Sequence, residues 1–178
     1  MVNTSSKFSL YDIVIVGLLA ALTAIGTLIK IPYGQGAMIH LGTATLFTAA
    51  ILFGGVRAGL AGAIASALVD IFSGFFLYTV WSFIIKGIAG LIVGSIAHSA
   101  GSRGKSIIKN IIACILGALW TLGGYLVAWT AVIGKFEAAL ANAPSSIITS
   151  SVGIVIAIPL AVTLGIALDK AGLRGFKS

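Results

Sequence analysis

The stretch that decides the fold is residues 10–29, LYDIVIVGLLAALTAIGTLI, which is apolar along almost its whole length. A helix of about 20 apolar residues spans the hydrocarbon core of a bilayer. This segment is longer than the apolar core of a typical signal peptide, and further apolar segments follow it. We therefore expect residues 10–29 to be a retained membrane helix, the first of several.

The composition of the 178-residue chain also indicates a membrane protein. Apolar residues make up 59% of it and charged residues only 8%, whereas soluble domains average about 25% charged residues. The mean hydropathy is +1.16. These values exclude a soluble enzyme, and they argue that the net charge of +7 reflects membrane topology and not a nucleic-acid partner. We expect a multi-pass protein of a prokaryotic cell membrane, embedded in the lipid bilayer.

Turn signals divide the chain into six predicted spans that form one domain over residues 1–178. Proline and glycine after Lys30 end the first span, and Gly54-Gly55 separates two short ones. The fold class we predict is an all-α integral membrane protein with six transmembrane helices in one bundle. The predicted spans are residues 10–29, 40–53, 58–71, 78–97, 107–133 and 146–168.

The basic residues predict the orientation of this bundle. Six spans place both chain ends on one side of the membrane, and cytoplasmic loops carry an excess of Lys and Arg. That side would hold Lys7, Arg57, Arg103, Lys105, Lys109, Lys170, Arg174 and Lys177, against Lys30, Lys86 and Lys135 on the other. We therefore expect both termini in the cytoplasm.

Polar and aromatic residues gather near the opposite, external ends of the spans, which favours a small-molecule site that opens outward. Asp70 and Lys86 are the main candidates, because a charge within a membrane span is costly and usually functional. Their alternatives are an ion pair with each other, or a lysine that extends to the interface. The further candidate contacts are His40, Thr43, Tyr78, Trp81, Tyr125 and Trp129, although the aromatic ones also suit a membrane-interface belt.

Catalytic, nucleotide and metal chemistry find little support in the sequence. Residues 101–106 resemble the end of a phosphate-binding loop, but Ser99 stands where the motif requires glycine. The lone Cys114 and the distant His40 and His98 assemble neither a metal site nor a catalytic triad. We expect no enzyme activity, no cofactor and no metal, and any ATP-driven step must come from partner subunits.

Small residues recur four apart in several spans, a spacing that lets helix backbones approach closely in lipid. In the third and fourth spans we interpret them as packing within the bundle. The first span carries two adjacent stripes, and we expect one of them to face a partner protein. The stripes are Gly17/Ala21 and Ala20/Ala24 in the first span, Gly59/Ala63/Ala67 and Gly62/Ser66/Asp70 in the third, and Gly87/Gly90/Gly94 in the fourth.

The order of several short motifs resembles the substrate-binding S components of energy-coupling factor (ECF) vitamin transporters, most closely the hydroxymethylpyrimidine and pyridoxine branch. The motifs are His40-Leu41-Gly42, Gly54-Gly55, Gly59, Gly62, residues 66–70 (SALVD), Ser73-Gly74, Tyr78, Ile85-Lys86-Gly87, Gly90, Gly94, Gly124-Tyr125, residues 138–140 (AAL) and Pro144.

This resemblance implies an outward ligand pocket covered by a lid loop at residues 30–40, with Tyr33, Gly34, Gln35 and Gly36 at its tip. It also implies that an Ala-x-x-x-Ala motif, Ala20 and Ala24 here, docks on the membrane-embedded coupling subunit, or T component. Two cytoplasmic ATPases would then drive the import.

Three positions depart from the family pattern. Thr43 stands where relatives often have aspartate, and Ser146 and Thr149 stand where they often have asparagine and glutamine. These positions line the pocket in the family, so the resemblance implies a neutral or weakly charged, hydroxylated heterocycle as the ligand. Two other interpretations remain open: a stand-alone facilitator or secondary transporter, and a scaffold without a ligand.

Overall fold

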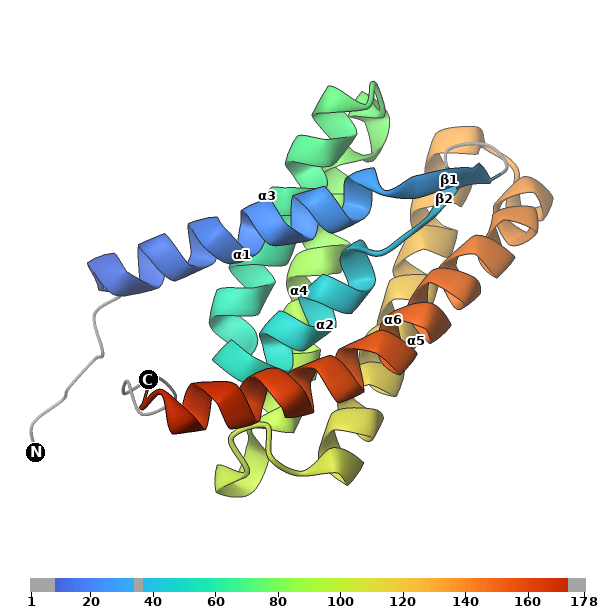
Figure 1. Cartoon of the computed structure of the whole chain (residues 1–178). Coiled ribbons are helices and arrows are strands. Elements are labelled where there is room, and N and C mark those ends of the chain that lie inside the picture. The colour runs from blue at the N-terminus through green and yellow to red at the C-terminus, as the bar shows by residue number, and fades with distance from the viewer. Residues whose placement is uncertain (1–8, 34–36, 173–178) are drawn as a thin grey trace, which may run out of the picture.

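The chain folds into a helical bundle with one short hairpin (Figure 1). The computed structural model describes residues 9–33 and 37–172. Its elements are α1 (Leu10–Leu28), β1 (Lys30–Tyr33), β2 (Ala37–His40), α2 (Gly42–Phe53), α3 (Gly55–Phe72), η1 (Phe76–Tyr78), α4 (Thr79–Ala97), η2 (Ser99–Gly101), α5 (Ile107–Ile133) and α6 (Phe136–Lys170).

The predicted all-helical membrane fold is confirmed, with one refinement. Among the described residues, five helices are long and apolar enough to cross a membrane, whereas α2 has only 12 residues. Ten of these 12 residues are buried, so α2 is enclosed by the longer helices. Large apolar side chains such as Ile13, Val14 and Ile108 are exposed on the outer helices, as a lipid-facing surface requires.

The sixth helix begins earlier than predicted. Only Gly134 and Lys135 separate α5 from α6, so the expected loop at residues 134–145 is mostly helix. Pro144 suggested a break, but it lies inside α6 together with Pro159. Membrane helices tolerate proline because neighbouring helices and hydroxyl side chains satisfy the freed backbone groups.

The predicted loop at residues 30–40 contains a β-hairpin. Strands β1 and β2 pair antiparallel, with Lys30 opposite His40 and Tyr33 opposite Ala37. The expected lid residues Gly34, Gln35 and Gly36 lie outside the described residues. The hairpin is fastened to the bundle where the backbone N–H of Leu41 donates to the carbonyl of Gly26, 3.0 Å away.

The glycines of α3 and α4 bring these two helices into backbone contact, which confirms the packing role predicted for them. A Cβ atom on Gly90 would lie 2.7 Å from the Gly59 nitrogen, and one on Gly59 would lie 2.8 Å from the Gly87 carbonyl oxygen. Side chains larger than hydrogen would therefore force the helices apart. Beside this seam, Phe47, Ile51 and Val93 form the centre of the apolar core.

The two small-residue stripes of α1 have different environments. Ala20 is 6% exposed and packs in the core, and Ala24 packs partly against it. Gly17 and Ala21 are exposed. The expectation that Ala20 faces a partner is therefore wrong, because the side of α1 that carries it is turned into the bundle.

Candidate functional site

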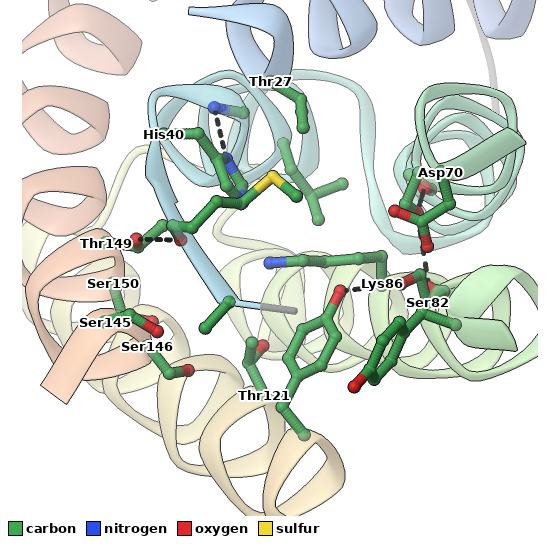
Figure 2. Close-up of a pocket in the computed structure, with 18 of the residues that line it drawn as sticks. Thr27, His40, Asp70, Ser82, Lys86, Thr121, Ser145, Ser146, Thr149 and Ser150 are labelled. Carbon is green, nitrogen blue, oxygen red and sulfur yellow. Dashed lines mark hydrogen bonds between the residues drawn. The ribbon is translucent and has the colours of Figure 1, made fainter. Parts of the chain in front are cut away.

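A pocket of about 730 Å³, including its open part, lies where the hairpin meets the ends of the long helices. Figure 2 shows side chains converging on it from α3, α4, α5 and α6. Its lining combines apolar walls with a few polar and charged side chains, as small-molecule sites do. Eight of the ten predicted contact residues line it: His40, Asp70, Tyr78, Lys86, Tyr125, Trp129, Ser146 and Thr149.

Two predicted contact residues do not line the pocket. Trp81 is half-buried and is not among the lining residues, although Ser82 and Lys86 of the same helix are. Thr43 is completely buried and acts from behind the pocket wall, as a partner of Lys86. The expectation of direct contact is wrong for both.

Hydroxyl side chains that the sequence reasoning missed make up much of the remaining wall. Thr23 and Thr27 project from α1, and Ser145 and Ser150 join Ser146 and Thr149 on α6. Their spacing gave a usable signal, since polar residues four apart in an apolar span share one helix face. The other missed hydroxyls are Ser66, Ser82 and Thr121.

Asp70 ends a short chain of hydrogen bonds. The Tyr125 hydroxyl donates to Ser82 Oγ over 3.0 Å, and the Ser82 side chain hydrogen-bonds the Asp70 carboxyl (Figure 2). The second carboxyl oxygen of Asp70, Oδ2, is buried and has no hydrogen-bond partner among the described residues. Buried polar groups in native proteins are almost always satisfied, so this oxygen calls for a hydrogen-bond donor.

The surroundings of Lys86 distinguish between its three predicted roles: a partner in an ion pair, a lysine that extends to the interface, and a pocket residue. Its side chain is 6% exposed, so it does not extend to the interface. Its Nζ donates to Thr43 Oγ1 at 3.1 Å and lies 5.6 Å from the centre of the Tyr125 ring. Among the described residues, no ion pair joins it to Asp70. Lys86 is therefore a buried cation inside the pocket.

Aromatic rings form one wall of the pocket. Tyr125 and Trp129 stack with their ring centres 5.5 Å apart and their planes at 27°. Tyr78 is buried beside them in the same apolar cluster. Such a wall provides a flat apolar surface for a planar ring.

His40 is neutral and has a defined tautomer. The backbone N–H of Gly42 donates to Nδ1 over 3.1 Å, so Nδ1 is an acceptor and the ring proton resides on Nε2. Burial, with smaller contributions from the Lys86 and Lys30 cations, lowers the pKa of His40 from 6.5 to about 3. The ring therefore offers the pocket an N–H donor without a charge.

The depressed pKa of His40 predicts a loss of stability in acid. The unfolded ring binds a proton below pH 6.5 and the folded ring only near pH 3. The stability that the neutral His40 ring contributes is thus fully present above pH 6.5 and is lost as the pH falls toward 3. Between pH 6.5 and 5 it amounts to at most about 2 kcal/mol. Melting temperatures of the detergent-purified protein should fall over this range, and less so in His40→Gln; equal pH dependence of both proteins would contradict the assignment.

The hairpin is tied across the pocket from two sides. Lys30 Nζ donates to Ser73 Oγ at the end of α3 over 2.6 Å and lies 5.7 Å from the Phe75 ring centre. On the other side, Thr149 Oγ1 of α6 donates to the Met38 carbonyl over 3.4 Å. These contacts hold the hairpin as a cover over the site.

This arrangement defines a class of protein: a multi-pass protein of the cell membrane with a covered small-molecule pocket between helix ends. Among the described residues, no group of histidine, cysteine and acidic side chains could hold a metal. Residues 7–166 match the family described as ECF-type riboflavin transporter, S component. The chain belongs to this family of substrate-binding subunits, which in general work with a T component and ATPases.

Two individual proteins are similar to the chain. An uncharacterised protein of Pyrococcus woesei is 31% identical over 91 residues, which cover 51% of this chain and 60% of that protein. The chain thus matches only about three fifths of the length of this relative. The structure of ThiT from Listeria monocytogenes superposes with a TM-score of 0.64 over 86% of this chain and 94% of ThiT. At 20% identity, this likeness supports the fold alone.

Proposed function

We propose that the chain captures a small water-soluble vitamin or precursor, of the hydroxymethylpyrimidine or pyridoxine type, from outside the cell. The observation that carries the proposal is a covered pocket that combines a buried carboxyl, a buried ammonium and an aromatic wall. The loaded subunit delivers its ligand by docking on the T component, and two separate ATPases supply the energy.

The course of Lys86 favours a single-ring ligand. Figure 2 shows its side chain extended across the middle of the pocket, between Asp70 and the hydroxyl groups of α6. A single ring needs less of the space that this side chain crosses than a larger ligand does. Riboflavin, which the family description names, has three fused rings and would have to displace it. Riboflavin is therefore the second candidate.

The stand-alone facilitator has less support. Such a transporter needs a polar path through the middle of the bundle. Below the pocket the core instead contains Phe47, Ile51, Val93 and Cys114, all fully buried. A ligand that cannot pass through the bundle requires movement of the whole subunit, which a coupling subunit would provide.

The test is ligand binding by the full chain purified in detergent. Native mass spectrometry should detect a co-purified heterocycle, and calorimetry should show tight binding of pyridoxine or hydroxymethylpyrimidine and weaker binding of riboflavin. Tight binding of riboflavin alone would transfer the assignment to the second candidate. Binding of none of the three would contradict the proposed function.

A further inference from the structure

The pocket contains a carboxyl oxygen that lacks a donor. Asp70 is 8% exposed, and its Oδ2 has no hydrogen-bond partner in the described part of the chain, although the Ser82 side chain hydrogen-bonds the carboxyl group. The hydroxyls of Thr23 and Ser150, which also line the pocket, are likewise buried without partners. A buried acceptor without a donor costs its full desolvation energy. The site is therefore complete only when a ligand donates a hydrogen bond to Asp70.

The same pocket contains an ammonium group with donors to spare. An ammonium group has three N–H donors. Among the described residues, Lys86 uses one of them on Thr43 Oγ1 and places its charge near the Tyr125 ring. Its remaining donors can bind an acceptor on a ligand. Asp70 is not that acceptor in this structure, because among the described residues no ion pair joins the two groups.

The two opposite charges therefore share one pocket without touching. His40 is neutral, and Lys30 is tied to Ser73 outside the pocket lining. The described lining thus has no net charge, but it presents an acceptor on α3 and a donor on α4 (Figure 2). A ligand with both a donor and an acceptor can hydrogen-bond both walls, whereas an anionic ligand group would be repelled by the negative charge of Asp70.

We infer that the ligand bridges Asp70 and Lys86, and that the pocket selects a small amphoteric heterocycle: an amine or ring N–H faces Asp70 and a hydroxyl or ring oxygen faces Lys86. This inference rests on the proposed function and specifies its substrate class. Phosphorylated and carboxylated forms of the same ring are excluded. Hydroxymethylpyrimidine carries the donor as its amino group, and pyridoxine carries it as the ring N–H of its pyridinium form. The hydroxyl groups of both compounds supply the acceptor.

Analogue ligands test the bridge on the unaltered protein. The probes are pyridoxine and hydroxymethylpyrimidine, each compared with one analogue that lacks the nitrogen donor and one that lacks the hydroxyl. Calorimetry should show at least tenfold weaker binding of each analogue, and of pyridoxine phosphate. Equal affinity for a parent compound and both its analogues, or for pyridoxine and pyridoxine phosphate, would overturn the inference.

Two variants assign the two ends of the bridge. Asp70→Asn should weaken binding of the parent compound at least tenfold, yet leave the affinity for the analogue without the nitrogen donor unchanged. Lys86→Met should also weaken binding of the parent compound at least tenfold, and it should leave the affinity for the analogue without the hydroxyl unchanged. Trp81→Phe, outside the pocket, is the matched control and should bind like wild type. If the wild-type protein binds neither parent compound, the proposed function itself fails. If the wild-type protein binds a parent compound and both variants bind it with the wild-type affinity, only the bridge is overturned.

Discussion

Replacing Gly17 by leucine is expected to abolish vitamin uptake while ligand binding and folding are retained. Gly17 is exposed on α1, and a Cβ atom at this position would meet no atom of the described residues within 4 Å. The larger side chain therefore fits without disturbing the bundle. It would, however, keep a partner helix from close approach along the Gly17/Ala21 stripe, where small residues allow tight packing in lipid.

The measurement is uptake of labelled vitamin into cells that also produce the T component and both ATPases. We expect at least a tenfold loss of uptake for Gly17→Leu, with unchanged calorimetric affinity in the purified subunit. Gly123→Leu is the matched control, because Gly123 is also exposed on a membrane helix, α5, with open space around its Cβ position. Equal loss of uptake in both variants would refute docking through α1.

The choice between the two stripes of α1 shows what a sequence alone leaves open. Gly17/Ala21 and Ala20/Ala24 lie on adjacent helix faces, and both have the spacing of a packing surface. Which face turns inward depends on the neighbouring helices. In the fold, Ala20 packs in the core. The stripe suggested by family resemblance is thus the one occupied by the bundle itself.

The spans were predictable because apolar length is a strong and local signal. The prediction for α5 matches the observed bounds of Ile107–Ile133. Local breakers were a weaker guide. Pro144 lies within a helix, and Pro32 lies in β1 opposite Met38, as proline can in a two-stranded ribbon that has only edge strands. Proline therefore misplaced one boundary, the start of the sixth span, whereas the first span ends before Pro32 as predicted.

Some residues of the pocket were also predictable from the sequence and others were not. Charged and aromatic residues stand out in an apolar chain, so Asp70, Lys86 and Tyr125 were recognised as pocket candidates. Thr23 was missed because a hydroxyl group is inexpensive in a membrane helix and carries little information singly. The lack of contact between Asp70 and Lys86 could not be predicted, because it depends on side-chain placement across α3, α4 and α2.

Replacing Gly94 by alanine is expected to destabilise the bundle by about 3 kcal/mol, the upper part of the range for overpacked cores. The added methyl group would overlap the backbone N and Cα of Gly55 and lie 2.6 Å from the carbonyl carbon of Gly54. All three are backbone atoms, so relief requires that α3 and α4 separate. Alanine also raises helix propensity by about 1 kcal/mol, and the expected loss is net of this gain.

Gly87→Ala is the control that isolates the packing cost. It lies on the same helix and gains the same propensity, but its Cβ would lie 3.3 Å from the Ala63 Cβ and 3.6 Å from the Gly59 carbonyl oxygen. Such contacts need only a shift of a few tenths of an ångström. Unfolding in mixed detergent should give a free energy within about 1 kcal/mol of wild type for Gly87→Ala. Equal stability of the two variants would mean that the glycine seam does not hold α3 against α4. The predicted gap would show that backbone contact holds α3, which carries Asp70, against α4, which carries Lys86.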